Sequence, residues 1–185
     1  LEQREEAGMD LDLDRTFDFS DQVAVVTGGS GVLFSLLAET LGRQGAAVVV
    51  VGHSHMERAQ EGVDRILEGG GRASAMQADV LDRDSLQDLA DGVLEAYGQI
   101  DILVNGAGGT RSDATTNEDL SFFDLPEDAV RWVLDVNLLG TFFTCQVLGR
   151  HMAERKKGAI LNIASMSSFQ PLTRAAPYSA AKAAV

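Results

Sequence analysis

Tyr178 and Lys182 are the residues of this sequence whose types and spacing most clearly suggest chemistry. They stand four positions apart in the helix-forming stretch 175–185, so a helix would place both side chains on one face. A tyrosine with an ordinary pKa of about 10 is a weak acid–base catalyst near neutral pH, but a nearby ammonium group favours its phenolate form. The chain has only two tyrosines and three lysines, so about 0.03 such pairs are expected by chance. The pair predicts proton transfer at an oxygen, and the alternative is an amphipathic helix with a surface lysine.

A glycine-rich turn is the second feature. Residues 27–31 read Thr-Gly-Gly-Ser-Gly, directly after an apolar run and directly before a helical pattern. Glycines let a backbone come close to a ligand, and the N-terminus of the following helix offers free N–H groups and a positive dipole end. The turn therefore favours binding of a dinucleotide pyrophosphate by Gly28, Ser30 and Gly31, against the alternative of a plain turn.

The end of the second apolar run carries Gly52 and His53, where an acid would bind the adenosine ribose of NAD. His53, with Arg58 close behind it, inclines the prediction toward NADP(H), because a 2′-phosphate needs a cation nearby. A histidine that merely starts a loop explains the same residue equally well. The choice between the two cofactors stays open at this point.

These residues need a scaffold that gathers them, and short apolar runs alternate with helical patterns along the chain. Strands that are apolar almost throughout, separated by helices, indicate a parallel sheet covered on both faces. We predict an α/β fold, a Rossmann-type doubly wound parallel sheet. The predicted strands are residues 23–27, 47–51, 73–78, 100–104 and 159–163, and the predicted helices are residues 33–42, 56–67, 82–97 and 126–157, the last with a bend near Asn137.

The same pattern gives the expected domain boundaries. Residues 1–16 are acidic and show little periodicity, so we expect a disordered N-terminal extension followed by one dinucleotide-binding domain over residues 17–185. Five strands are one fewer than the six of the usual dinucleotide-binding order. The stretch 175–185 stops without a cap or a breaker, so we expect that the C-terminal strands and helices of the domain are missing from this chain.

Composition restricts the class of partner. The 185 residues carry a formal net charge of −13, which argues against a nucleic acid or an anionic membrane surface as partner. The longest uninterrupted apolar run, residues 46–51, is far shorter than the roughly 20 residues of a spanning helix. The single cysteine, Cys145, cannot form an internal disulfide, which fits a cytoplasmic location. No metal site is expected, because His55 and His151 lack partner ligands at suitable spacing.

Five motifs, in the right order, resemble the short-chain dehydrogenase/reductase family, and the resemblance covers about residues 17–185. They are the turn at 27–34, Asp79 in Ala-Asp-Val, Asn105 in Asn-Gly-Ala-Gly, Asn137 in Val-Asn-Leu-Leu-Gly, and Ser165 in Asn-Ile-Ala-Ser, thirteen residues before Tyr178. The resemblance implies an NAD(P)-dependent oxidoreductase that interconverts a secondary alcohol and a ketone by hydride transfer.

The resemblance also implies roles for single residues. Tyr178 would exchange a proton with the substrate oxygen, and Ser165 would hydrogen-bond the same oxygen. Lys182 would bind the nicotinamide ribose and lower the pKa of the tyrosine, and Asn137 would hold a water of the proton relay. The implied cofactor-binding residues are Gly28, Ser30, Gly31, Leu33, His53, Asp79, Val80, Asn105, Gly106, Ala107, Tyr178 and Lys182.

Two positions depart from the family's pattern. Phe34 stands where the family has the last glycine of the cofactor turn, and Gly106 stands where it has a second asparagine. Glycine at the first position permits close packing of helix and strand. The benzyl group of Phe34 must therefore point elsewhere or displace the cofactor.

Several stretches are similar to the D-mannonate or fructuronate oxidoreductase branch of the family, and they are residues 31–33, 105–109, 114–116, 121–125 and 165–185. The implied substrate is a sugar acid, whose carboxylate needs a cation. Arg111 and Arg174 are the candidates, and ordinary solvated loop arginines are the alternative. The resemblance further implies a homodimer or homotetramer in the full-length protein.

Two other functions remain open. The same family includes polyol reductases and 3-oxoacyl thioester reductases, which would change the substrate and keep the chemistry. A nucleotide-binding module without turnover is the second alternative, because Phe34 stands in the cofactor turn and we expect the C-terminal part of the domain to be missing.

Overall fold

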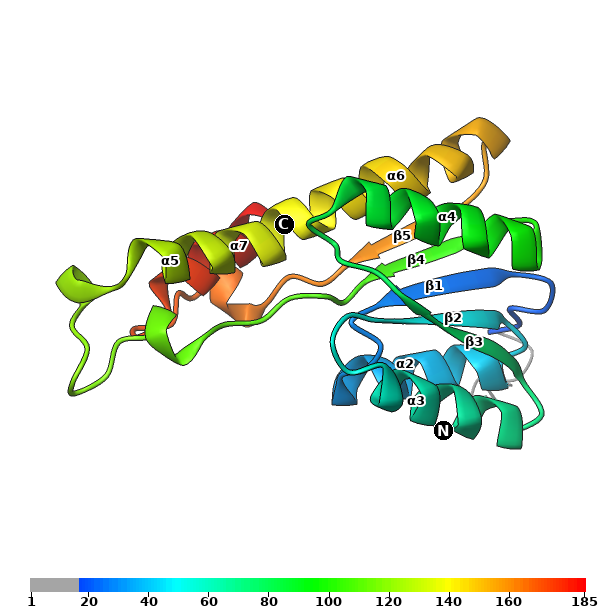
Figure 1. Ribbon diagram of the computed structural model, residues 1–185, viewed down its shortest axis with the longest axis horizontal. Coiled ribbons are helices and arrows are strands. Elements are labelled where there is room, and N and C mark those ends of the chain that lie inside the picture. Colours follow the sequence, from blue (N-terminus) through cyan, green and yellow to red (C-terminus); the bar gives the residue numbers. More distant parts are fainter. Residues whose placement is uncertain (1–16) are drawn as a thin grey trace, which may run out of the picture.

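The fold is a five-stranded parallel sheet with helices on both faces, in a computed structural model that describes residues 17–185 (Figure 1). The strand order is β3-β2-β1-β4-β5, with the chain crossing over after β3. The strands are β1 (Val23–Thr27), β2 (Ala47–Gly52), β3 (Arg72–Gln77), β4 (Ile102–Asn105) and β5 (Ala159–Asn162). This order confirms the predicted doubly wound α/β fold, whereas the proposed extension over residues 1–16 lies outside the described residues.

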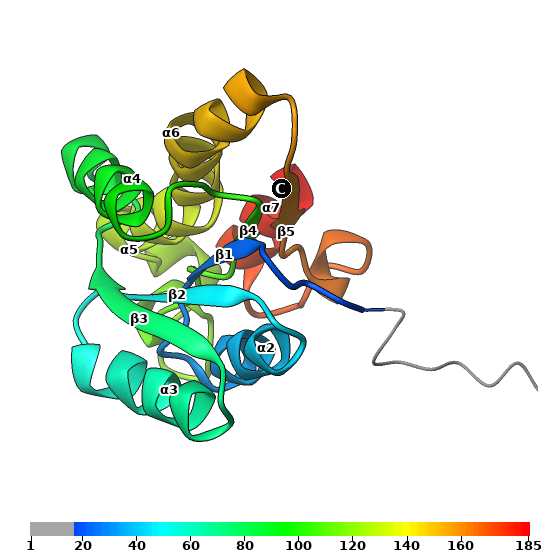
Figure 2. The same cartoon turned by 90° about the vertical axis from the view of Figure 1, so that its right-hand side faces the viewer.

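The helices cover the two faces in pairs, as Figure 2 shows end on. Helices α2 (Val32–Arg43) and α3 (Met56–Glu68) lie on one face, and α4 (Arg83–Tyr97) and α6 (Gly140–Arg155) lie on the other. Helix α4 begins at a capped end, because the Asp82 carboxylate accepts hydrogen bonds from the backbone N–H groups of Asp84 and Ser85. Each predicted helix is therefore present.

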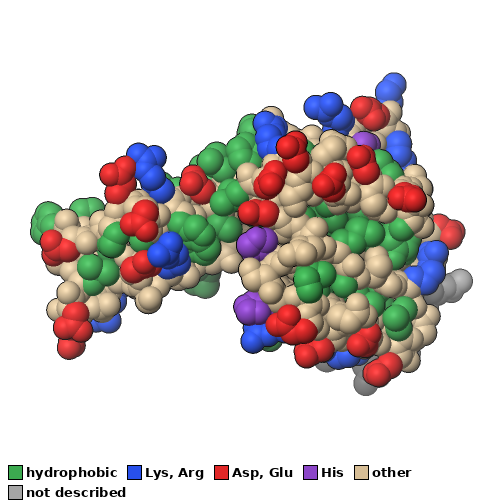
Figure 3. All heavy atoms as spheres, in the orientation of Figure 1, with side chains coloured by type: hydrophobic (Ala, Val, Ile, Leu, Met, Phe, Trp, Pro, Cys, Tyr) green, Lys and Arg blue, Asp and Glu red, His purple; other side chains and the backbone are tan. Residues whose placement is uncertain are grey.

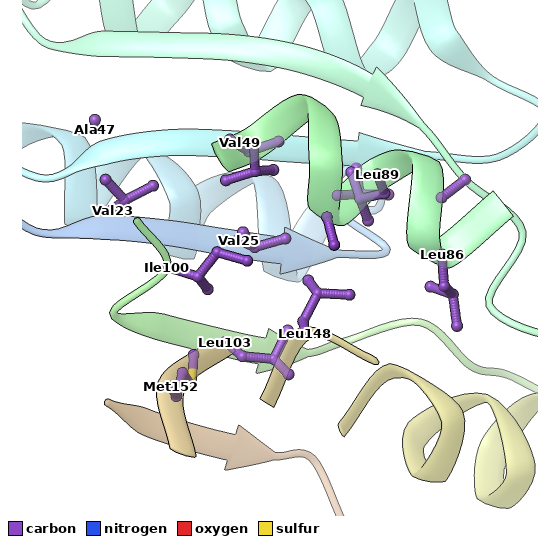
Figure 4. Packing of buried hydrophobic residues seen from close by; sticks show 14 residues of the cluster. Val23, Val25, Ala47, Val49, Leu86, Leu89, Ile100, Leu103, Leu148 and Met152 are labelled. Atoms are coloured by element: carbon purple, nitrogen blue, oxygen red, sulfur yellow. The ribbon is translucent and has the colours of Figure 1, made fainter. Parts of the chain in front are cut away.

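Alternate side chains of the central strands fill two separate cores. In β1, Val23 and Val25 face α4 and α6, and the intervening Ala24 and Val26 face α2 and α3. Figure 4 shows the first core, where Val25 lies between its neighbours in β2 and β4 and under Leu89 of α4. A central parallel strand is buried on both faces, which explains why β1 and β2 are apolar throughout.

The strand boundaries differ from prediction at β4. The apolar run beginning at Ile100 predicted a strand from that residue, but β4 begins at Ile102. Ile100 is fully buried in the core between α4 and the sheet although it precedes the strand. Burial, rather than strand pairing, accounts for its apolar character.

A long helical segment connects β4 to β5 and carries a defect at its centre. Helix α5 (Glu127–Leu134) passes through a π-helical turn, η3 (Asp135–Leu139), into α6. The turn stands where a bend near Asn137 was predicted. By length and composition alone, Glu127–Arg155 could cross a membrane, yet its residues Leu148 and Met152 are buried against the sheet.

Beyond the carboxyl ends of the strands the chain forms a lobe. Figure 1 shows α5 and α7 (Ala176–Ala184) side by side, together with the loops that follow β4 and β5. Three short 3-10 helices belong to these loops, and they are η1 (Ser112–Ala114), η2 (Phe122–Asp124) and η4 (Met166–Ser168). The lobe brings Tyr178 and Lys182 of α7 to the same edge of the sheet as the glycine-rich turn.

The opposite edge of the sheet is held by Asp101, whose side chain is only 2% exposed. One carboxylate oxygen accepts the backbone N–H of Val23 at 2.9 Å and the Gln99 amide at 2.8 Å. The other oxygen accepts the Arg155 guanidinium at 3.0 Å. Asp101 thus ties β1, β4 and the end of α6 together.

We predict that Asp101→Ala lowers the free energy of unfolding by about 2–3 kcal/mol, because it leaves the Val23 N–H and the half-buried Arg155 charge without their acceptor. Urea unfolding followed by circular dichroism measures the change. The matched control is Asp91→Ala, which removes an exposed acid from α4 and should change stability by less than about 0.5 kcal/mol. Equal effects of the two substitutions would contradict this assignment.

Candidate active site

Thr27 joins the loops that follow β1 and β4. Its hydroxyl donates to the Val104 carbonyl at 3.3 Å and accepts the backbone N–H groups of Gly106 and Ala107 at 3.1 and 3.2 Å. Parallel strands place their carboxyl ends at one edge, and ligands of open α/β sheets bind outside that edge. Thr27 therefore fixes the two loops against each other at the expected binding edge.

The glycine-rich turn fits a dinucleotide pyrophosphate. Gly28 has a φ of +66°, and a Cβ there would lie 2.7 Å from the Gly106 carbonyl oxygen, so only glycine fits this close approach. Helix α2 follows from Gly31 with no side-chain cap and no acid in its first turn. Its first N–H groups and positive dipole end are thus left for an anion.

A cavity of about 270 Å³ opens beside this turn. Figure 3 shows the face that carries it, with histidine side chains beside the hollow between the lobe and the sheet. Six of the predicted cofactor-binding residues line the cavity, and they are Gly28, Ser30, His53, Asp79, Val80 and Ala107. The other six predicted residues lie outside its lining, and they are Gly31, Leu33, Asn105, Gly106, Tyr178 and Lys182.

His53 and Asp79 face each other at the cavity wall, with 3.7 Å between Nε2 and Oδ2. The Asp79 carboxylate also accepts the Leu81 N–H at 2.9 Å, and the Gln77 amide donates to the His53 carbonyl at 2.9 Å. The ends of β2 and β3 are thereby held in one arrangement. His53 therefore offers an imidazole, and Asp79 a carboxylate acceptor, to a ribose or a base.

Sequence reasoning missed seven residues of the lining. They are Val51, Gly52, Ala78, Leu81, Gly108, Trp132 and Val136. Trp132 and Val136 are four positions apart and lie on the face of the helix that approaches Gly108. Val136 directly precedes Asn137, and Trp132 lies one helical turn before Val136. The motif around Asn137 could therefore have pointed to both residues.

Asn137 is fully buried in the π-helical turn. Its amide oxygen accepts the Gly109 N–H at 3.0 Å, and its amide nitrogen donates to the carbonyls of Gly109 and Val133 at 2.6 and 2.8 Å. A π-helical turn frees a backbone carbonyl and often marks a functional position. The turn here presents Asn137 to the loop after β4.

Lys182 reaches the same place from α7. A Cβ on Gly108 would lie 2.5 Å from the Asn137 amide oxygen and 3.5 Å from the Lys182 Nζ. The ammonium group donates to the Ile163 carbonyl at 2.7 Å and lies 5.9 Å from the centre of the Tyr178 ring. Burial lowers the pKa of Lys182, which is only 6% exposed. Asn137 and Lys182 thus meet at Gly108, and the Tyr178 ring lies beside the Lys182 ammonium.

Tyr178 and Ser165 are held by the lobe. The half-buried Tyr178 ring packs against Ala114, Ala129 and Val133. The 3-10 turn that begins at Ser165 is attached to α7, because the Ser168 hydroxyl donates to the Lys182 carbonyl at 2.6 Å. All four predicted catalytic residues therefore belong to segments that contact one another at the carboxyl edge of the sheet.

The two arginines proposed for a substrate carboxylate differ in their surroundings. Arg111 donates to both carboxylate oxygens of Asp113, at 2.9 and 2.6 Å, and this pairing raises the pKa of Arg111. Within residues 17–185, the Arg174 guanidinium makes no hydrogen bond or ion pair. Arg174 is therefore the cation still available to a ligand.

Phe34 does not enter the dinucleotide cavity. A Cβ on Gly106 would lie 2.6 Å from Cγ of Phe34 and 2.6 Å from the Thr27 carbonyl oxygen. The Phe34 ring also packs on the core between α2, α3 and the sheet. The two departures from the family's pattern are complementary, because the ring at position 34 fills the space that a side chain at position 106 would need.

No group of three or more His, Cys, Asp or Glu within residues 17–185 is arranged to hold a metal ion.

The comparisons with known proteins agree with this geometry. The family model described as "short chain dehydrogenase" matches residues 22–185. The uncharacterized oxidoreductase UxuB of Bacillus subtilis is 40% identical over 176 residues, covering 91% of this chain and 63% of that protein. The chain thus spans less than two thirds of this relative's length.

Two solved structures extend the comparison. A Haemophilus influenzae protein with bound NAD, provisionally named a D-mannonate oxidoreductase, superposes with a TM-score of 0.86 at 31% identity, over 94% of this chain and 65% of that one. A metagenomic short-chain oxidoreductase in complex with NADP gives 0.80 at 30% identity, over 89% and 72%. The neighbours therefore bind either nicotinamide cofactor.

Phe34 and Gly106 generate a stability prediction. Gly106→Asn should lower the free energy of unfolding by about 2–3 kcal/mol through overpacking, and Phe34→Gly by about 3 kcal/mol through the cavity it leaves. In the double variant the loss should be smaller than the sum by at least about 1 kcal/mol, because removal of the Phe34 ring relieves its collision with the new side chain and leaves only the one with the Thr27 carbonyl. Urea unfolding of the four proteins measures the coupling.

The control for this coupling pairs Gly106→Asn with Leu37→Ala. Leu37 packs on the same core from α2 without approaching Gly106, so these two losses should add. Additive losses in both pairs would show that Phe34 and Gly106 do not compensate each other.

Proposed function

The chain belongs to the short-chain dehydrogenase family, and on that premise we propose that the whole protein is an NAD(P)-dependent oxidoreductase that interconverts a secondary alcohol and a ketone. The observation that carries the proposal is the meeting of Asn137 and Lys182 at Gly108, which lines a cavity that fits a dinucleotide, with the Tyr178 ring 5.9 Å from the Lys182 ammonium. The nicotinamide ring, when bound, supplies the hydride chemistry.

The chain's own residues would handle the proton. The Tyr178 hydroxyl donates a proton to the forming alkoxide oxygen, or accepts it in the reverse direction. The Lys182 ammonium, which the Ile163 carbonyl orients, lies 5.9 Å from the centre of the Tyr178 ring and would bind the nicotinamide ribose. The Ser165 hydroxyl donates a hydrogen bond to the same substrate oxygen and holds it in place. Asn137 fixes the loop after β4 through two hydrogen bonds to the backbone of Gly109, and so keeps this loop next to Lys182.

We predict that Tyr178→Phe lowers kcat/KM by about 100-fold or more, because the proton donor is lost while the ring packing is kept. The measurement is hydride transfer followed by NAD(P)H absorbance in the full-length protein. The matched control is Tyr97→Phe, which removes the only other tyrosine hydroxyl, bonded at 2.9 Å to Ser74 Oγ in the edge strand β3. An undiminished rate in Tyr178→Phe would overturn the mechanism.

For the cofactor we propose a preference for NADP(H). His53 stands where an acid would select NAD, and Arg58 lines a neighbouring hollow that shares Ser30 with the dinucleotide cavity. Asp79 near His53 opposes this preference in part by its charge. Titration of NADH and NADPH by fluorescence measures it, and tighter binding of NADH would reverse the assignment. If the full-length protein binds neither NADH nor NADPH, a module without turnover is favoured instead.

For the substrate we propose a sugar acid such as D-mannonate or D-fructuronate. The name given to the Haemophilus influenzae neighbour supports this class, and Arg174, whose guanidinium has no partner among residues 17–185, offers an exposed cation on the segment between Ser165 and Tyr178. The alternative is a polyol, which an NAD-bound xylitol dehydrogenase, 27% identical at a TM-score of 0.82, favours. A 3-oxoacyl thioester has no comparable support.

We predict that Arg174→Ala raises KM for a uronate by about 10- to 100-fold, because a charged hydrogen bond is lost, and leaves KM for an uncharged polyol within about twofold. Steady-state kinetics with both substrates measure the split. The control is Arg43→Ala, which removes an exposed arginine from the C-terminal end of α2. Equal increases for both substrates would exclude Arg174 as the carboxylate-binding residue.

We further propose that the full-length protein is a cytoplasmic homodimer or homotetramer built on the helices of Asn137 and Tyr178. The half-exposed Phe142 and the partly exposed Leu139 form an apolar surface on the first of these helices. Sedimentation equilibrium measures the assembly, and a monomer at micromolar concentration would contradict it.

A further inference from the structure

We propose that Trp132 forms the stacking wall for the adenine ring of the cofactor, and that Arg111, paired with Asp113, positions its indole. This inference rests on the proposed function, because it assumes that the cavity beside the glycine-rich turn holds a dinucleotide. It assigns a cofactor contact to a residue that no family motif contains. It also gives Arg111 a role other than substrate binding.

The first observation is the place of Trp132. It belongs to α5 and lines the dinucleotide cavity together with Val136, one turn further along the same helix. The side chain is 37% exposed in a protein region where its neighbours Ala129 and Val133 are fully buried. Part of a large aromatic surface is thus left facing the cavity instead of the core.

The second observation is the support behind the indole. The Arg111 guanidinium lies 5.6 Å from the centre of the Trp132 ring, a distance at which a cation attracts an aromatic face. Both carboxylate oxygens of Asp113 fix that guanidinium, at 2.9 and 2.6 Å. Ala114, the next residue, is fully buried against α5. The segment that carries Arg111 is therefore anchored to the helix that carries Trp132.

The third observation is the chemistry of the other side chains that line the cavity. Val51, Val80 and Leu81 supply aliphatic surface at the ends of β2 and β3, and Asp79 supplies a carboxylate acceptor. A cavity lined by an aromatic ring, aliphatic side chains and a carboxylate acceptor suits a purine with an exocyclic amino group. The nicotinamide end of the same ligand would lie toward Lys182, which approaches Gly108 on the far side of the loop.

The first test uses adenosine monophosphate as a probe of the adenine half. Trp132 is the only tryptophan in the 185-residue sequence, so its emission should change when the nucleotide stacks on it. Trp132→Ala should weaken binding of the nucleotide by about 5- to 100-fold, as loss of one base–aromatic stack does. Trp132→Phe should retain most of the affinity, because a phenyl ring can also stack.

The matched control is Phe123→Ala. It removes another aromatic side chain of the same lobe, one that is 91% exposed and does not line the cavity. Its affinity for the nucleotide should stay within twofold of the parent protein. Thermal melting of each variant separates lost binding from lost folding, and the Trp132→Phe protein keeps the proposal testable if the alanine variant unfolds.

The second test concerns Arg111. Arg111→Ala should weaken nucleotide binding by about 3- to 10-fold and lower the steady-state fluorescence anisotropy of Trp132, because the indole loses its support. In the Trp132→Ala background the same change should have no further effect on affinity. The control is Arg131→Ala, since Arg131 neighbours Trp132 in the chain and pairs with Glu127 outside the cavity.

The outcomes separate this inference from the proposed function. If NADPH or NADH binds, judged by the fluorescence of its own nicotinamide, while adenosine monophosphate leaves Trp132 emission unchanged, the stacking wall is excluded and the oxidoreductase stands. If neither cofactor binds the full-length protein, both proposals fail together. If Arg111→Ala raises KM for a uronate without changing nucleotide affinity, Arg111 binds substrate and does not position Trp132.

Discussion

The close approach of two backbone segments, the turn after β1 and the loop after β4, is the constraint on which the site depends. Thr27 holds them together through one hydroxyl, which accepts two backbone N–H groups from the second loop. A side chain at Gly28 would collide with the Gly106 carbonyl. Because the loop runs so close to the turn, its next glycine, Gly108, can lie against Asn137 and Lys182. The loop after β4 therefore does two things: its residues Ala107 and Gly108 line the dinucleotide cavity, and Gly108 also contacts the predicted catalytic residues.

The same constraint explains how the chain tolerates its departures from the family's pattern. Only a small volume is available between α2 and the loop after β4, and one side chain can occupy it. Phe34 occupies it from the helix side, and Gly106 leaves it empty from the loop side. The benzyl group that, from the sequence, could have displaced the cofactor thus packs beneath the turn, which removes one of the two grounds for a non-catalytic module.

Charge is distributed in a way that the net value of −13 conceals. Residues 1–20 contribute −5 of it, and the predicted site contains both cations and acids. Lys182 is buried beside Tyr178, Arg111 is paired with Asp113 under the indole of Trp132, and Arg174 is exposed without an ionic partner among residues 17–185. Helix α2 offers the free N–H groups of its N-terminus to an anion at the glycine-rich turn, and acids far from the turn are screened by solvent.

The sequence by itself determined the order of strands and helices, the glycine-rich turn and the Tyr178–Lys182 pair. Each of these depends on residues close together in the chain, where periodicity and spacing decide which side chains share a face. The tertiary structure decided where the ring of Phe34 lies, that Trp132 lines the cavity, and that Arg111 is already paired. Phe34 meets Gly106 across more than seventy residues of chain, and Trp132 meets the ends of β2 and β3 across more than fifty. Such contacts depend on how the helices dock on the sheet, and no local pattern encodes that docking.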